Sequence, residues 1–296
     1  MNIVKKGKLM SRALLAEGKT KQVFAVEEDP SRVDIFSKED ITAGDGKKHD
    51  ILKGKADFAN RTTCNVFRLL KSAGIPVAFD EQTGPTSFRA PRCRMLPYEV
   101  VVRREAHGSY LKRNPSLVKG RRFEELLLEY FLKTSGKKWK AHSLICDDPL
   151  IGFVWSPTEK YLYGLRLYNP AADMLGQDPF LILLPDEVLS DAKEVAYIKR
   201  MGDIAKSTFL SLETAWNRVG CKLVDFKVEF GVSDAGELLL ADVIDNDSWR
   251  VIEDGAYLDK QVYRDGGGLD EVIAKYARVA DITDTFNPPP SHTSTV

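Results

Sequence analysis

The sequence has few cysteines, no net charge and no long hydrophobic run. Its four cysteines stand far apart and form no CxxC pair, so neither a disulfide framework nor a cysteine-ligated zinc site is expected. Free thiols are typical of a reducing cytoplasm. Lysine plus arginine and aspartate plus glutamate number 43 each, which leaves no overall positive field to attract a nucleic acid. Any binding of anions must therefore be local.

Membrane insertion and secretion are not indicated either. No segment reaches the ~18 apolar residues that a membrane helix needs. The early apolar run at residues 13–16 is much shorter than the hydrophobic stretch of a signal peptide. Together with the cysteines, this predicts a cytoplasmic protein. A chain of 296 residues with 43% hydrophobic content can bury a substantial core, either as one two-lobed unit or as two domains.

Strand and helix patterns alternate along the chain, which predicts a mixed fold. The expected strands cover residues 17–26, 33–38 and 99–105. The expected helices cover 55–72 and a longer stretch from Ser190, a candidate N-cap, to Gly220. The long helix repeats apolar residues at helical spacing, so it is predicted to lie in the core. Three consecutive prolines near the C-terminus predict a disordered tail, which we place at residues 281–296.

The segment from Leu223 to Ile244 is predicted to form a hairpin around the turn sequence SDAG at residues 233–236. Strict alternation in its first strand places Lys227 and Glu229 on a charged face. With Asp234 and Ala235 as the turn residues, Lys227 would lie opposite Asp242.

This register predicts a metal and phosphate site, because Glu229 becomes a diagonal neighbour of Asp242 at about 7 to 8 Å. Two carboxylates and an ammonium at this spacing could hold a divalent metal and a phosphate together. The alternative is a solvated face with a cross-strand ion pair. A shift of one residue in register would send Asp242 to the opposite face.

Basic residues elsewhere indicate further phosphate contacts. Lys19 and Lys21 share a face of the first expected strand, directly after Gly18, where a backbone can approach a phosphate closely. Arg103 comes before Gly108-Ser109, whose amide and hydroxyl could join a guanidinium around a phosphate. Taken singly, each is also explained as surface charge. No Walker or Rossmann pattern is present.

Several motifs, taken together, resemble the phosphoribosylaminoimidazole-succinocarboxamide synthase (SAICAR synthetase) family of purine biosynthesis. They are EGKTKQVF at 17–24, ITAGDGKK at 41–48, PYEVVVRREAHGSYLKRNP at 97–115, EYFLK at 129–133, LVDFKVEFGV at 223–232, ADVIDNDSWRV at 241–251 and LDKQVYRD at 258–265. They occur in the family's order and are most similar to the synthase part of the animal bifunctional enzyme.

The resemblance implies an ATP-dependent ligase. ATP, L-aspartate and carboxyaminoimidazole ribonucleotide would give the succinocarboxamide, ADP and phosphate. A carboxylate is a poor electrophile, and phosphorylation to an acyl phosphate supplies a leaving group. Such an enzyme must neutralise phosphates and align groups rather than supply a nucleophile. The expected partners are these small molecules and Mg²⁺, with no nucleic acid and no membrane, and the expected assembly is a homo-oligomer.

The implied fold is α+β and two-lobed, related to kinases and ATP-grasp enzymes, with ATP between the lobes. We expect a β-rich nucleotide-binding lobe at residues 1–95 and an α/β lobe with the substrate and metal site at 96–280. Residues of about 134–190 depart from the family pattern and include an unfamiliar aromatic stretch. This middle segment is expected to pack on the core or to form a subunit interface.

Site residues follow from matching the motifs position by position. Lys19 and Lys21 would face the ATP phosphates, with Met95 near the adenine at the hinge between the lobes. Glu229 and Asp242 would bind magnesium, and both would thereby contact the nucleotide. Val243 stands where many members have a second acid, so Asp242 would act alone.

The remaining matches concern catalysis and the other substrates. The catalytic residues would be Lys227, Asp242 and Asp45. The substrate-binding residues would be Arg103, Ser109, Lys112, Lys133, Asp148 and Arg250. Among these, two arginines and the serine would hold the ribotide phosphate, and the match of Asp148 is affected by the extra residues before it.

Two other functions stay open at this point. A kinase-like phosphotransferase would have the same lobes, but the HRD and DFG strings of kinases are absent. A non-catalytic nucleotide-binding relative would result if the middle segment blocked the aspartate site.

Overall fold

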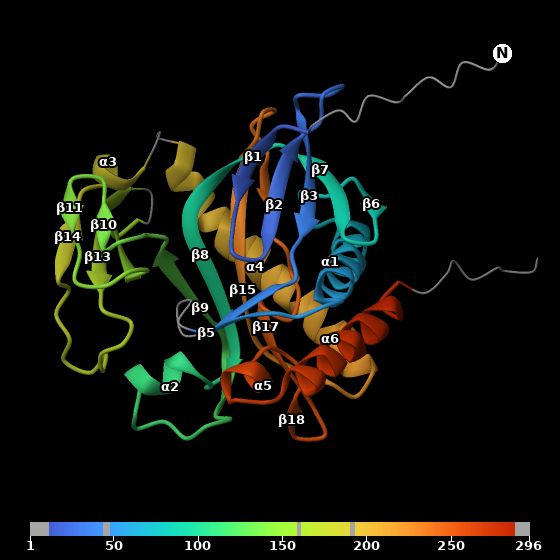
Figure 1. Ribbon diagram of the computed structural model, residues 1–296. Coiled ribbons are helices and arrows are strands. Elements are labelled where there is room, and N and C mark those ends of the chain that lie inside the picture. Colours follow the sequence, from blue (N-terminus) through green and yellow to red (C-terminus); the bar gives the residue numbers. More distant parts are fainter. Residues whose placement is uncertain (1–11, 44–47, 159–160, 190–192, 288–296) are drawn as a thin grey trace, which may run out of the picture.

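The computed structural model describes residues 12–43, 48–158, 161–189 and 193–287. An antiparallel five-stranded sheet of order β1-β2-β3-β7-β6 occupies the N-terminal third (Figure 1). Its strands are β1 (Leu14–Glu17), β2 (Lys21–Ala25), β3 (Arg32–Ser37), β6 (Glu81–Gly84) and β7 (Ser87–Pro91). Helix α1 (Lys55–Ser72) packs on this sheet, where Phe67 meets Phe88 at a ring separation of 5.9 Å. β4 (Asp40–Ala43) and β5 (Lys48–Ile51) form a separate hairpin.

A nine-stranded sheet forms the rest of the framework, in the order β14-β13-β12-β9-β8-β15-β17-β18, with β16 also paired to β15. Its strands are β8 (Cys93–Glu105), β9 (Arg122–Leu132), β12 (Leu150–Trp155), β13 (Leu162–Tyr168), β14 (Leu181–Leu183), β15 (Lys222–Ser233), β16 (Leu238–Leu240), β17 (Trp249–Glu253) and β18 (Ala256–Tyr257). The short strands β10 (Lys138–Trp139) and β11 (His142–Ser143) pair with each other.

The long helix α4 (Lys193–Arg218) covers one face of the large sheet, and α6 (Leu269–Asp284) packs beside α1 (Figure 1). The shorter helices are α2 (Ser109–Arg113), α3 (Pro185–Val188) and α5 (Gln261–Arg264). The apolar stripe of α4 is buried as its spacing predicted: Trp216 has no exposed surface and packs on Trp249 and Phe286, with ring separations of 5.3 and 5.0 Å. Among the described helices, none is long and apolar enough to cross a membrane.

The helix predicted at 55–72 is confirmed, but the first predicted strand is wrong as a single element. The expected strand 17–26 is divided, because β1 ends at Glu17 and β2 begins at Lys21. The Gly18 N–H donates to the Lys21 carbonyl at 2.9 Å and closes a tight hairpin. Lys19 therefore lies in a turn and does not share a strand face with Lys21.

The predicted register of the hairpin in 223–244 is also wrong by one residue. Val232 pairs with Leu238 rather than Glu237, and β16 ends at Leu240, before the residue that was expected to pair. Lys227 consequently does not lie opposite Asp242; its backbone N–H donates to the Ser248 carbonyl at 2.7 Å. The turn is longer than two residues, since the Ser233 N–H donates to the Glu237 carbonyl at 2.9 Å.

The boundary expected for the tail is wrong, because α6 continues to Asp284 and Phe286 is buried. The apolar residues of α6 and Phe286 pack in the core, and the prolines that indicated a tail begin only after them. Residues 288–296 lie outside the described part of the chain, as do the N-cap candidate Ser190 and the candidate catalytic residue Asp45.

The middle segment packs on the core, one of the two outcomes expected for it. β12 pairs with β9, and β13 and β14 continue the large sheet outward. Leu165, Leu167 and Leu183 have no exposed surface and belong to the main hydrophobic cluster. Its alternating apolar residues supply the buried face that an added strand pair needs.

Candidate active site

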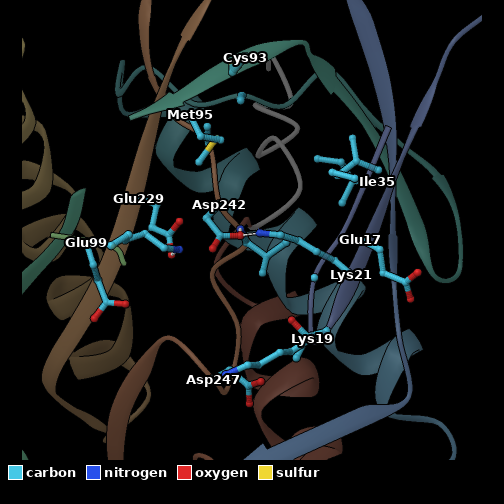
Figure 2. Close-up of a pocket in the computed structure, with 18 of the residues that line it drawn as sticks. Glu17, Lys19, Lys21, Ile35, Cys93, Met95, Glu99, Glu229, Asp242 and Asp247 are labelled. Atoms are coloured by element: carbon cyan, nitrogen blue, oxygen red, sulfur yellow. Dashed lines mark hydrogen bonds and ion pairs between the residues drawn. The ribbon is translucent and has the colours of Figure 1, made fainter. Parts of the chain in front are cut away.

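A cavity of about 1150 Å³ lies between the two sheets, and residues from both line it. β1, β2 and the turn between them contribute one wall, and β15 with the loop after β16 contributes the other. The β7–β8 connection forms the hinge end, where Met95 and Cys93 are directed into the cavity (Figure 2). The lining there is largely apolar and includes Val33, Ile35 and Ala90. Such a pocket suits a flat aromatic ring.

The centre of the cavity holds three ion pairs between lysines and carboxylates. Lys21 pairs with Asp242 (Figure 2), and Lys133 pairs with Glu229. Lys227 pairs with Glu99 at 2.7 Å. Because each ammonium neutralises one carboxylate, the unliganded cavity carries little net charge at its centre despite six ionised groups.

The pKa values of two of these lysines are shifted in opposite directions. Desolvation lowers the pKa of Lys21 to about 8, while the Glu229 carboxylate opposes that shift. Desolvation also lowers the pKa of Lys227, but the Glu99 carboxylate outweighs it, so this pKa is raised overall. Lys227 therefore stays cationic at neutral pH, and a nearby anion would strengthen the cationic form of Lys21.

Asp242 reaches the cavity by a route that the hairpin register did not predict. The Ala241 N–H donates to the Glu229 carbonyl at 3.0 Å, which ends the pairing with β15. The Asp242 carboxylate then accepts the Val243 N–H at 2.7 Å as the chain leaves the sheet. The predicted neighbourhood of Glu229 and Asp242 at one cavity is thus present, but the loop after β16 creates it instead of strand alternation.

A second cluster consists of arginines and acids and lies further along the same sheet. Arg103 contacts Glu129 at 2.7 Å and Asp225 at 2.8 Å, and Arg250 contacts Asp225 at 2.7 Å. Arg113 also pairs with Glu129, at 2.5 Å. We call these five residues the arginine cluster. Three guanidiniums against two carboxylates leave one positive charge in a largely buried place, which favours binding of an anion.

Strand pairing places the cavity and the arginine cluster on one face of the large sheet. Glu229 pairs with Glu99, and Asp225 pairs with Arg103, four residues further along both strands. Lys227 lies between them on β15. Side chains two residues apart share a face, and each residue advances about 3.3 Å, so roughly 13 Å separate the two centres. One extended ligand could contact both.

The predicted site residues fall into three groups. Those that line the cavity are Lys19, Lys21, Met95, Lys133, Asp148, Lys227, Glu229 and Asp242. Those at or near the arginine cluster are Arg103, Arg250, Ser109 and Lys112; the last two are exposed on α2. Asp45 lies outside the described residues. Asp148, which follows the extra residues of the middle segment, lies at the cavity. Its carboxylate accepts the Thr134 N–H at 2.8 Å, and burial raises its pKa.

Among the charged cavity residues that the sequence did not identify are Asp247, Lys260 and Arg264. Asp247 and Lys19 lie at the end of the cavity away from Met95 (Figure 2). The Asp247 carboxylate accepts bonds from Lys260 at 3.1 Å and from the Tyr276 hydroxyl at 2.5 Å. All three lie inside the motifs ADVIDNDSWRV and LDKQVYRD, so the motifs themselves carried the signal for these residues.

The carboxylates at the cavity suit a magnesium ion that is shared with a phosphate better than a metal ion held by protein ligands alone. Within the described ranges, no three His, Cys, Asp or Glu side chains converge into a metal-binding group. Magnesium is usually bound by one or two carboxylates together with substrate phosphates. Glu229 and Asp242, which line the same cavity, match that requirement.

Comparison with known proteins agrees with this geometry. The family model for SAICAR synthetase matches residues 14–146 and 172–282. The chain belongs to the SAICAR synthetase family. A Chloroflexus aurantiacus phosphoribosylaminoimidazole-succinocarboxamide synthase is 40% identical over 91% of this chain and 95% of that protein. The probable multifunctional protein ADE2 of Caenorhabditis elegans is 39% identical over 93% of this chain and 59% of its own length.

Solved structures of SAICAR synthetases share the fold. One, a SAICAR synthetase in complex with ADP, superposes with a TM-score of 0.68 at 28% identity, over 93% of this chain and 99% of that one. The α+β fold, the family and the ATP-dependent ligase function predicted from the motifs are confirmed. Between residues 14 and 282, the family model leaves 147–171 unmatched. The departure from the family pattern expected for residues of about 134–190 is therefore wrong at both ends of that range, because 134–146 and 172–190 match the model.

Proposed function

We propose that this chain joins L-aspartate to carboxyaminoimidazole ribonucleotide with the cavity as its ATP site and the arginine cluster as its site for the ribotide phosphate. The observation that carries this proposal is the order of groups on one sheet face: paired acids and lysines at the cavity, Lys227 in between, and Arg103 with Arg250 at the far end. That order follows the substrate, whose carboxylate must meet ATP while its phosphate lies at the other end.

In this arrangement ATP lies between two lobes, as in kinases and ATP-grasp enzymes, with residues 1–95 forming the nucleotide-binding lobe and 96–280 the other. The apolar hinge end around Met95 would receive the adenine, and Lys19 and Lys21 would face the phosphates. The complex of a related SAICAR synthetase with ADP supports a nucleotide in this fold.

Glu229 and Asp242 would hold magnesium, which when bound neutralises phosphate charge and orients the transferred group. Their present partners, Lys133 and Lys21, would then pair with phosphate oxygens instead. This exchange of partners leaves the lysines and the carboxylates with opposite charges beside them, both without ligands and with magnesium and ATP bound.

The chemistry needs two steps on the ribotide carboxylate. Its oxygen attacks the γ-phosphorus of ATP, so that ADP leaves and an acyl phosphate forms. The neutral amine of aspartate then attacks the acyl carbon, phosphate departs with the bonding electrons, and the amine loses a proton. Lys227, held cationic by Glu99, would stabilise the negative charge on the transferred phosphoryl group and on the leaving phosphate. Asp45, Lys112, Lys133, Asp148 and Ser109 stay predictions as substrate contacts, as do a cytoplasmic location and a homo-oligomeric state.

The experiment is an ADP-release assay with ATP, Mg²⁺ and the carboxylated ribotide, with and without aspartate. We expect release to require aspartate. Aspartate-independent release would favour the kinase-like alternative, and no release would favour a non-catalytic relative. Lys227→Ala and Asp242→Ala should each abolish turnover while circular dichroism stays unchanged. The matched control, Lys53→Ala at an exposed position away from the cavity, should keep full activity.

A further inference from the structure

The turn that joins β8 to α2 is coupled to Arg250. Gly108 adopts φ 55° and ψ −131°, a backbone conformation that residues other than glycine rarely adopt. A Cβ atom at Gly108 would lie 2.1 Å from a terminal nitrogen of Arg250. The guanidinium therefore rests directly on the backbone of this turn, so the position of Arg250 and the conformation of Gly108-Ser109 depend on each other.

A buried histidine precedes this turn, and both of its ring nitrogens have partners. His107 is 3% exposed. Its Nδ1 lies 2.6 Å from the Tyr257 hydroxyl, and its Nε2 lies 3.3 Å from a Glu105 carboxylate oxygen. An ionised carboxylate only accepts, so Nε2 carries the proton and Nδ1 accepts from the tyrosine. Desolvation lowers the pKa of His107, which is consistent with a neutral ring.

Tyr257 connects this turn to a distant part of the chain. It lies on β18, whose residue pairs join it to β17, the strand that carries Arg250. The Tyr257–His107 hydrogen bond therefore links residues 150 positions apart in sequence. The aromatic rings also meet edge to face, with centroids 6.0 Å apart. Through this link, the two halves of the anion site, Gly108-Ser109 and Arg250, are held at a fixed separation.

We propose that His107 and Tyr257 are positioning residues that hold the Gly108-Ser109 turn against Arg250 and thereby set the affinity of the site for the phosphate monoester of the ribotide. Neither residue needs to contact the substrate. The proposal rests on the proposed function, because it assumes that the arginine cluster binds this phosphate.

The physical basis is the restricted geometry of phosphate binding. A backbone amide, a hydroxyl and a guanidinium stabilise one phosphate only when their donors converge within hydrogen-bond distance. Loss of one buried hydrogen bond leaves the other partner unsatisfied and allows the turn to move. Because the cavity lies roughly 13 Å away along the sheet, ATP binding should be unaffected.

The test uses Tyr257→Phe, which removes one hydroxyl oxygen and keeps the ring contact. We expect the KM for the ribotide to rise about tenfold, with kcat and the KM for ATP within about twofold of the unmodified enzyme. His107→Gln should behave in the same direction. The matched control is Tyr163→Phe, at a tyrosine that is 59% exposed on β13, and it should change none of these constants.

A binding measurement separates positioning from general loosening of the fold. Calorimetric titration would compare aminoimidazole carboxamide ribotide with the corresponding riboside, which lacks the phosphate. Tyr257→Phe should weaken binding of the ribotide about tenfold and leave that of the riboside unchanged. Equal weakening of both ligands, or no weakening, would overturn the proposal. If the tyrosine variant does not fold, His107→Gln gives the same comparison.

Arg250→Met distinguishes failure of the phosphate site from failure of the positioning role. If the unmodified enzyme binds ribotide and riboside equally, or if Arg250→Met leaves their difference intact, then the arginine cluster is not the phosphate site and the proposed function is wrong in that part. If Arg250→Met removes the difference but both Tyr257→Phe and His107→Gln keep it, the phosphate site stands and only the positioning role is refuted.

Discussion

Lys133 and Lys21 each form an ion pair with a carboxylate that would bind magnesium in the proposed function. An ammonium and a divalent cation at one carboxylate repel each other, so magnesium alone must displace a lysine that then has no partner. A nucleotide removes this obstacle, because its phosphates pair with the displaced ammonium groups. Magnesium and ATP are therefore expected to bind together more strongly than either binds alone.

Removing one of these lysines should consequently favour magnesium in the absence of nucleotide. In Lys133→Met, we expect the affinity for Mg²⁺ alone to rise about fivefold, as fits the ~1 kcal/mol of a partly exposed ion pair, and the affinity for MgADP to fall. Isothermal titration at constant ionic strength measures both quantities. Lys53→Met serves as the control. A lower Mg²⁺ affinity in Lys133→Met would contradict this account of the ion pairs.

The pairing of β8 with β15 positions the hinge end of the cavity. Their register shifts between Glu229 and Gly231, and at Gly231 a Cβ atom would lie 2.6 Å from the Cβ of Cys93 and 3.2 Å from the sulfur of Met95. The Cys93 Cβ cannot move without its strand. The absence of a side chain at Gly231 therefore allows β8 and β15 to approach where both border the cavity.

Gly231→Ala should push the hinge strand away from β15. We expect the free energy of unfolding to fall by about 1 to 3 kcal/mol, as for other overpacked sites, and the KM for ATP to rise because Met95 moves with the strand. Thermal unfolding and steady-state kinetics test the two effects. Gly268→Ala, at the N-cap of α6 where φ is −65° and nothing lies within 4 Å of the added carbon, should lower the free energy of unfolding less and leave the KM for ATP unchanged. A Gly231→Ala enzyme with unaltered ATP kinetics would show that the hinge geometry does not depend on this contact.

The main hydrophobic cluster spans both sheets and the helices α1, α4 and α6, and a smaller one lies between β4 and α6. Phe286, just beyond α6, packs on Trp216 of α4, and Trp216 in turn packs on Trp249 of β17. This chain of rings connects the C-terminal helix to the strand that carries Arg250. The last described residues thus contribute to the core and not to a solvent-exposed tail.

Phe286→Ala should lower the free energy of unfolding by about 3 kcal/mol, because a large buried ring is replaced by a cavity. The thermal midpoint should fall by several degrees, while kcat stays within twofold because the ring is remote from the cavity. Leu269→Ala, on the same helix but 39% exposed, should cost much less. Comparable losses for the two variants would mean that the C-terminal helix is not fixed through Phe286.

The sequence by itself determined the family, the helix at 55–72, the apolar face of α4 and eight of the side chains that line the cavity. These follow from local patterns: helical periodicity and the motifs around Lys21, Lys227, Glu229 and Asp242 depend on residues close together in the chain. Only the tertiary structure decided that Lys19 lies in a turn, that Asp242 meets Lys21 instead of Lys227, and that Lys260 and Arg264 border the cavity. The turn at Lys19 depends on the local Gly18–Lys21 hydrogen bond, which alternation alone does not reveal. The other contacts join residues far apart in sequence, and a one-residue change of register or the exit of a loop from a sheet sets them.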